Sequence, residues 1–120
     1  MKILVVDDEK KIANVLADRL GLRGFEAVAV YNGSSALLRL KKETFDAAIL
    51  DLRLPDMDGK DVLRNIAEDF PGIRVVIVSG HANEHEFQTC LEMGAIACFH
   101  KPVNIVTIIK AFERSINDGI

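Results

Sequence analysis

The feature that most restricts how this chain can fold is a set of short, unbroken aliphatic runs separated by longer segments of mixed character. Three runs are aliphatic at every position: Ile3–Val6, Ala47–Leu50 and Val75–Val78. Such solid runs are typical of strands buried on both faces, as in a parallel sheet covered by helices. Two further runs, Ala27–Val30 and Ala95–Phe99, contain smaller residues, which suits strands at the edges of that sheet.

The segments between these runs carry apolar residues at helical spacing. The stripes are Ile12, Val15, Leu16 and Leu20; Ala36, Leu37 and Leu40; Val62, Leu63, Ile66 and Ala67; Phe87, Cys90 and Leu91; and Ile105, Ile108, Ile109, Phe112 and Ile116. We expect Gly94 to end the fourth helix and the fifth to end near Gly119. Five strands alternating with five helices predict one α/β domain over residues 1–120, with a doubly wound parallel sheet.

Composition excludes several classes of protein. The 120 residues suit one domain, and a hydrophobic content of 49% can build a core. The longest apolar runs have five residues, too short for a membrane helix or signal peptide, so we expect a cytoplasmic protein without membrane contact. A net charge of −3 argues against direct nucleic-acid binding. Cys90 and Cys98 lack CxxC spacing and are expected to be reduced, buried hydrophobic residues.

Polar residues follow the predicted strands, at the edge where open parallel sheets bind ligands. In chain order they are Asp7, Asp8 and Glu9, then Asp51, Ser79 and Lys101. Close carboxylates repel one another unless a cation lies among them, and Mg²⁺ prefers such oxygen ligands. A carboxylate nucleophile, a metal ion, a lysine and a hydroxyl together favour phosphoryl chemistry. Helix capping could explain Asp8 or Asp51 singly, but not the whole set.

This pattern resembles the receiver domain of response regulators, the phosphoryl-accepting module of two-component signalling, over the whole chain. Asp7 and Asp8 close "ILVVDD", Asp51 opens "DLRLPDMDG", and Ser79 and Lys101 stand near the ends of "VVIVSG" and "CFHKP". Four such motifs in order at strand ends are highly specific. The "SGHAN" stretch is similar to receivers of the nitrogen-regulation and nitrogen-fixation type. The resemblance implies a flavodoxin-like (βα)5 sandwich with strand order 2-1-3-4-5.

The resemblance also implies roles for the residues at the sheet edge. Asp51 is expected to accept a phosphoryl group from a phosphohistidine on a sensor histidine kinase or phosphotransfer protein. Asp8 would bind Mg²⁺ directly and Asp7 largely through water. The backbone carbonyl of Arg53 would be a further metal ligand. Lys101 would pair with Asp51 and then with the phosphoryl oxygens.

Ser79 and Phe99 are the expected switch residues. Ser79 would turn its hydroxyl onto the phosphoryl group, and Phe99 would move inward without the hydroxyl that many relatives carry as Tyr. The surface of the fourth helix, fifth strand and fifth helix would then change to control an output domain or effector protein, as in transcription regulation, or form a homodimer. The chain would be a switch and not an enzyme beyond its own phosphorylation and slow dephosphorylation. A cis peptide before Pro102 is expected by resemblance alone.

A different class remains as an alternative, a Mg²⁺-dependent phosphatase of the haloacid-dehalogenase type. Asp56–Gly59 matches its DxDG motif, but no buried strand directly precedes this segment. Asp51 does follow a strand, but the second residue after it is Arg53, which cannot act as a general acid. We expect Asp58 to cap the third helix instead. A flavin-binding protein is a third possibility, although no phosphate-cradling glycine loop is present.

Two histidines and one arginine near the site carry weaker signals. His81 and His85 have the spacing of metal ligands on a helix, but the segment from Ser79 to Asn83 is predicted to be a loop, so surface histidines are favoured. In receivers the positions of Arg53 and His81 flank the path of the attacking water. We hypothesise that both side chains lengthen the life of the phosphoryl group.

Overall fold

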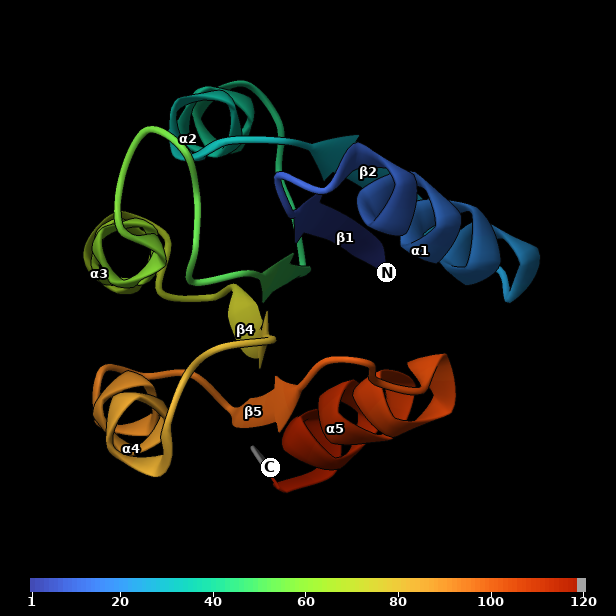
Figure 1. Ribbon diagram of the computed structural model, residues 1–120. Coiled ribbons are helices and arrows are strands. Elements are labelled where there is room, and N and C mark those ends of the chain that lie inside the picture. Colours follow the sequence, from blue (N-terminus) through green and yellow to red (C-terminus); the bar gives the residue numbers. More distant parts are fainter. Residues whose placement is uncertain (119–120) are drawn as a thin grey trace.

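Five parallel strands form one sheet in the order β2-β1-β3-β4-β5, the order that the resemblance implied. In the computed structural model, which describes residues 1–118, the strands are β1 (Lys2–Val6), β2 (Glu26–Val30), β3 (Ala47–Leu50), β4 (Arg74–Ser79) and β5 (Ala97–His100). The helices are α1 (Lys10–Leu22), α2 (Gly33–Lys42), α3 (Gly59–Asp69), α4 (Glu84–Glu92) and α5 (Ile105–Asp118). Helices α1 and α5 cover one face of the sheet, and α2, α3 and α4 cover the other (Figure 1).

Alternate residues of β1 enter two separate cores, which explains its solid aliphatic sequence. Leu4 and Val6 pack in the core under α2, α3 and α4, whereas Ile3 and Val5 pack in the core under α1 and α5. All four are at most 1% exposed. Because successive side chains of a strand point to opposite faces, a strand between two helical layers needs an apolar residue at every position.

The buried side of α1 differs from the predicted stripe. Leu20 is fully buried as expected, but so is Ala13, while Ile12 and Val15 are 42% and 43% exposed. Alanine has little weight in a hydrophobic pattern, yet its small side chain lets this helix lie close to the sheet. The prediction was therefore wrong for Ile12 and Val15, which form an apolar surface beside the carboxyl end of the sheet. Ala67 of α3 and Leu91 of α4 are likewise exposed and not buried.

The ends of some elements also differ from the sequence prediction. Strand β5 begins at Ala97 and not at Ala95, and Ser79 is the last residue of β4 and not part of the following loop. Gly94 follows α4 with a φ of +113°, which confirms it as the helix stop. Gly119 lies outside the described residues. Cys90 is buried and Cys98 partly buried, both with free thiols.

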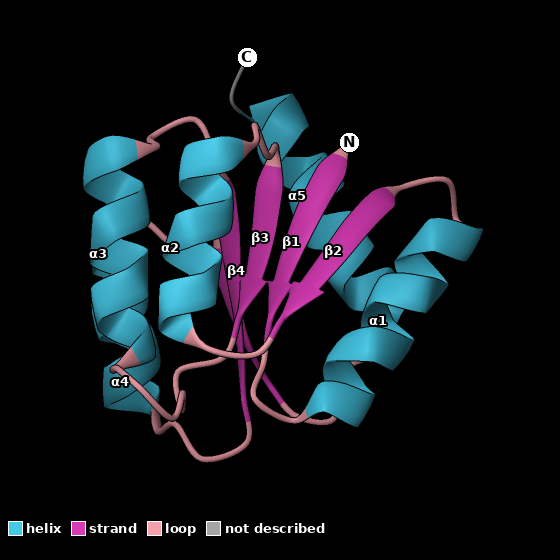
Figure 2. Cartoon of the chain, turned by 90° about the horizontal axis from the view of Figure 1, so that it is seen from above, coloured by secondary structure: helices cyan, strands magenta, loops and turns pink. Residues whose placement is uncertain are grey.

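The loops that follow the strands lie together at one edge of the sheet. In Figure 2 the arrowheads of the strands point to the lower edge, where these loops connect to the helices. Among residues 1–118, no helix has both the length and the apolar character needed to cross a membrane. The loops at this edge carry the polar residues that the sequence singled out.

Candidate functional site

Three charged residues are fixed at the carboxyl edge by backbone hydrogen bonds that extend the sheet by one residue. The N–H of Asp7 donates to Val30 O (3.1 Å), that of Asp51 to Val6 O (3.0 Å), and that of Lys101 to Ser79 O (2.9 Å). Because the ladder continues past each strand, their side chains leave the sheet from defined positions. Asp7 and Asp51 are only 6% and 5% exposed, which is rare for aspartate.

Lys101 joins three carboxylates from two segments, the β1–α1 connection and the residue after β3. Its Nζ lies 2.7 Å from Asp7 Oδ2, 2.9 Å from Asp51 Oδ2 and 3.1 Å from Glu9 Oε1. The lysine is held over the sheet by a loop that begins with a cis peptide between Lys101 and Pro102, as the resemblance implied. The predicted pairing of Lys101 with Asp51 is thus present in the structure.

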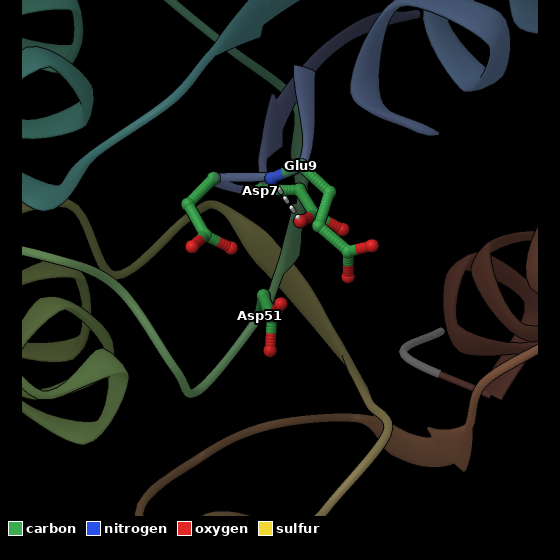
Figure 3. A group of neighbouring side chains, drawn as sticks. Asp7, Glu9 and Asp51 are labelled. Atoms are coloured by element: carbon green, nitrogen blue, oxygen red, sulfur yellow. Dashed lines mark hydrogen bonds between the residues drawn. The ribbon is translucent and has the colours of Figure 1, made fainter. Parts of the chain in front are cut away.

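The carboxylates outnumber the cation that they share. Asp7, Asp8, Glu9 and Asp51 each offer an oxygen, and these oxygens lie within 4.8 Å of one another. Figure 3 shows Asp7, Glu9 and Asp51 turned toward a common space, with the Glu9 N–H donating to Asp7 Oδ1 (3.0 Å). Glu9 had no role in the sequence prediction, although it directly follows the aspartate pair. A cluster of hard oxygen donors is the chemistry of a divalent cation site.

Burial and charge act in opposite directions on the ionisable groups of this cluster. Burial raises the pKa of Asp7 above its ordinary value, and hydrogen bonds from Lys101 and the Glu9 N–H offset only part of that effect. Burial alone would lower the pKa of Lys101, but its hydrogen bonds to Asp7 and Asp51 outweigh this and raise it. Lys101 therefore remains an ammonium ion at neutral pH.

The two expected switch residues occupy different environments. Ser79 is fully buried at the end of β4, and its Oγ accepts a 3.4 Å hydrogen bond from the His81 N–H. Phe99 of β5 is partly buried and lines a groove of about 620 Å³ against α5, together with Lys110 and Arg114. Ser79 therefore lies at the carboxyl edge, and Phe99 lies on the face of the sheet that α5 covers.

The backbone and the side chain of Arg53 point to different parts of the molecule. Its N–H donates to Asp51 Oδ1 (3.2 Å). Its guanidinium extends to α4 and donates to both carboxylate oxygens of Glu86, at 3.2 and 3.0 Å. This contact with Glu86 was not predicted, because nothing in the sequence places α4 beside the β3–α3 loop. His81 and His85 are both exposed, as expected for surface histidines.

Asp56 and Asp58 serve the local structure. Asp56 accepts hydrogen bonds from Gly33 N–H (2.8 Å), Ser34 N–H (2.9 Å) and the Ser34 hydroxyl (2.7 Å), which holds the β3–α3 loop on the start of α2. Asp58 caps α3 by accepting from the Lys60 N–H (2.9 Å), as predicted. The DxDG segment of the phosphatase alternative is thus used for helix starts, and that alternative has no support.

Comparison with known proteins gives one consistent family. The model of the response regulator receiver domain matches residues 3–113. Sporulation initiation phosphotransferase F of Bacillus subtilis is 33% identical over 113 residues, covering 94% of this chain and 91% of that protein. An NtrX-like response regulator of Rickettsia felis is 32% identical over 117 residues, covering 96% of this chain but 25% of that protein.

A solved structure has the same fold and carries relevant chemistry. It is a response regulator protein from Burkholderia pseudomallei with a phosphorylated aspartic acid, a calcium ion and citrate. The two structures superpose with a TM-score of 0.90 at 26% identity, covering 98% of this chain and 69% of the other. Other curated relatives are much longer than this chain. The chain spans 46% of the regulatory protein VanRc of Enterococcus gallinarum and 11% of the sensor histidine kinase RcsC of Salmonella typhimurium.

Proposed function

Because this chain belongs to the response regulator receiver domain family, we propose that it is a signalling switch that accepts a phosphoryl group on Asp51. The observation that carries this proposal is the Lys101 ammonium, 2.9 Å from Asp51 and 2.7 Å from Asp7 at the carboxyl edge of the sheet. Asp51 is 5% exposed, and among residues 1–118 its carboxylate has, apart from the Arg53 N–H, only the lysine that it shares with Asp7 and Glu9. This is the environment that a carboxylate nucleophile for phosphoryl transfer requires.

The acidic cluster fits a Mg²⁺ ion. Its donors are all carboxylate oxygens, and Mg²⁺ is bound by one or two carboxylates, water and phosphoryl oxygens. We assign Asp8, Asp51 and the Arg53 backbone carbonyl as direct ligands, with Asp7 acting largely through water. When bound, the ion offsets the negative charge that phosphorylation adds. The calcium ion in the Burkholderia pseudomallei structure supports a cation in receivers of this kind.

The transfer itself uses the residues of this chain in defined roles. A carboxylate oxygen of Asp51 attacks the phosphorus of a phosphohistidine on a kinase or phosphotransfer protein. The P–N bond breaks, and its electron pair returns to the imidazole. The Lys101 ammonium then moves from the carboxylate to the phosphoryl oxygens, and the Ser79 hydroxyl donates a hydrogen bond to one of them. Charge-assisted hydrogen bonds of this kind contribute about 1.5–3 kcal/mol each.

The phosphodonor is expected to approach over the exposed side of α1. A groove of about 550 Å³ reaches from Asp51 and Lys101 along this helix. The apolar residues that α1 and the segment after Lys101 contribute to its lining are Ile12, Val15, Leu16, Pro102, Val103 and Ile105. A partner that packs on this surface would bring its phosphohistidine directly to Asp51.

The output surface is α4, β5 and α5. Engagement of Ser79 by the phosphoryl group would let Phe99 move inward, which changes the groove that it shares with Lys110 and Arg114. An output domain or effector protein would respond to this change, and transcription regulation is the outcome that the NtrX-like relative favours. Gel filtration with and without beryllofluoride would show whether activation also produces a homodimer.

The proposal is tested by incubating the chain with Mg²⁺ and acetyl phosphate and measuring its intact mass. We expect one phosphoryl adduct per chain, lost in Asp51→Asn and retained in the matched variant Asp56→Asn. Repeated turnover of phosphate esters, or an adduct that persists in Asp51→Asn, would contradict the proposal.

A further inference from the structure

The contact between Arg53 and Glu86 links the phosphoacceptor loop to α4. Glu86 is in the first turn of α4, and the two side chains form a paired set of hydrogen bonds at 3.0 and 3.2 Å. Such fork-like pairing of arginine with a carboxylate fixes orientation as well as distance. The charges of Asp51 and Asp58 also act on the guanidinium of Arg53. The Arg53 guanidinium is thus near Asp51 but is held at α4 by Glu86.

Glu86 is itself held in place from two further directions. Its N–H donates to the capping side chain of Asn83 (2.8 Å), which fixes the start of α4. Its Oε2 lies 3.5 Å from Lys60 Nζ in the first turn of α3. The Glu86 side chain is only 18% exposed, whereas that of Arg53 is 48% exposed. The carboxylate is therefore the more buried and more extensively held partner, and the arginine is the more exposed one.

Starting from the proposed function, we infer that Glu86 is a positioning residue for the chemistry at Asp51, because it holds Arg53 away from the phosphoryl group. The Arg53 N–H already contacts Asp51, so its guanidinium starts within the same loop as the acceptor. A phosphoryl group adds about −1.5 to −2 charges at that point. Glu86 and the phosphoryl group then compete for one guanidinium.

The competition sets the lifetime of the phosphorylated state. In hydrolysis a water oxygen attacks the phosphorus, the bond from phosphorus to the Asp51 oxygen breaks, and its electron pair returns to the carboxylate. The protons of the water leave with inorganic phosphate. Arg53 on the phosphoryl oxygens covers the approach of this water, so stronger retention by Glu86 shortens the lifetime. Release of Arg53 would also free α4 from the β3–α3 loop.

The decisive variant is Glu86→Gln, which removes the charge that retains Arg53. We expect the phosphoryl group of this variant to be hydrolysed about two- to fivefold more slowly with Mg²⁺ present. Beryllofluoride should bind the variant more tightly by a similar factor. The matched control is Glu84→Gln, an exposed glutamate in the same turn, which should leave both values unchanged. Glu86→Asp retains the charge and should lie between the wild type and Glu86→Gln.

A double variant separates positioning from a structural effect. If Glu86 acts through Arg53, Arg53→Ala combined with Glu86→Gln should decay at the rate of Arg53→Ala alone. An unchanged lifetime in Glu86→Gln, or the same slowing in the Arg53→Ala background, would overturn the inference. If Glu86→Gln fails to fold, Glu86→Asp replaces it, with a smaller slowing expected because the shorter side chain weakens the contact with Arg53 but keeps the charge. A wild-type chain that takes up no phosphoryl group would instead overturn the proposed function.

Discussion

Asp51 and Asp56 lie on the same β3–α3 connection but are surrounded in opposite ways. Asp56 accepts three hydrogen bonds from Gly33 and Ser34, and the Ser34 hydroxyl is the main reason that its pKa falls to about 2. Asp51 instead shares one ammonium, that of Lys101, with other carboxylates. The Asp56 carboxylate, which is hydrogen-bonded by neighbouring residues, stabilises the fold. The Asp51 carboxylate, which shares its cation, retains the capacity to bind a ligand.

The largest effect that would sharpen this comparison is expected from Lys101→Met. Loss of the ammonium removes the main positive charge at the acceptor, so the rate of phosphorylation by acetyl phosphate should fall about 100-fold or more. Lys41→Met, an exposed position on α2, is the control. If Lys101→Met were phosphorylated at a rate within twofold of the wild type, the shared ammonium could not be what distinguishes Asp51 from Asp56.

Two glycines provide a second comparison, because each lies beside one of the aspartates. A Cβ at Gly59 would lie 2.5 Å from the Asp51 carbonyl oxygen and from Leu52 Cα, which are backbone atoms. A Cβ at Gly33 would come closest to the flexible side chain of Met57, at 2.4 and 2.5 Å, and would lie 3.2 Å from Val62 Cγ2. We expect Gly59→Ala to cost about 2–3 kcal/mol and Gly33→Ala about 1 kcal/mol in urea unfolding. Equal costs would show that the acceptor loop adjusts as easily as Met57.

The two aspartates should affect stability with opposite signs. Asp51→Asn removes one of the carboxylates that repel each other around Lys101, so the chain should gain about 0.5–2 kcal/mol of unfolding free energy. Asp56→Asn removes the acceptor that holds the loop on α2, so Tm should fall. Thermal unfolding without divalent cations measures both variants. A loss of stability in Asp51→Asn would contradict the view that repulsion among the carboxylates around Lys101 destabilises the chain when no divalent cation is present.

The smallest effect concerns acid unfolding. The folded-state pKa of Asp56, about 2, lies below its ordinary value of 3.8, so its stabilisation is present above 3.8 and is lost as the pH falls toward 2. The stability difference between the wild type and Asp56→Asn should therefore shrink over that range. Asp7, with a raised pKa, should give the opposite trend, because protonation relieves the cost of its burial. Denaturant titrations between pH 5 and pH 2 test both trends.

The arrangement of the strands and the main site residues could be predicted because each leaves a strong local signal. A strand buried on both faces needs a solid aliphatic run, and the residue after it is placed by the ladder of hydrogen bonds. Asp7, Asp51 and Lys101 therefore meet as expected, although they are far apart in the chain. Parallel topology carries most of this information.

Contacts between neighbouring helices and loops could not be predicted in the same way. The hold of Asp56 on the start of α2 and the pairing of Arg53 with Glu86 depend on how the loops cross the sheet edge. Neither has a sequence motif. The exposed Ile12 was misassigned because the small Ala13 takes the buried position on α1. Glu9 had a signal in its position after Asp7 and Asp8, but its reach to Lys101 depends on the side-chain conformation.

The most direct test of the central claim is to locate the phosphoryl group within the chain. Phosphorylated protein would be reduced with borohydride, which converts an aspartyl phosphate to homoserine, and then mapped by peptide mass spectrometry. We predict homoserine at position 51 alone, formed only when Mg²⁺ is present. Homoserine at the position of Asp7, Asp8 or Asp56, or at none, would contradict the assignment of Asp51 as the phosphoacceptor.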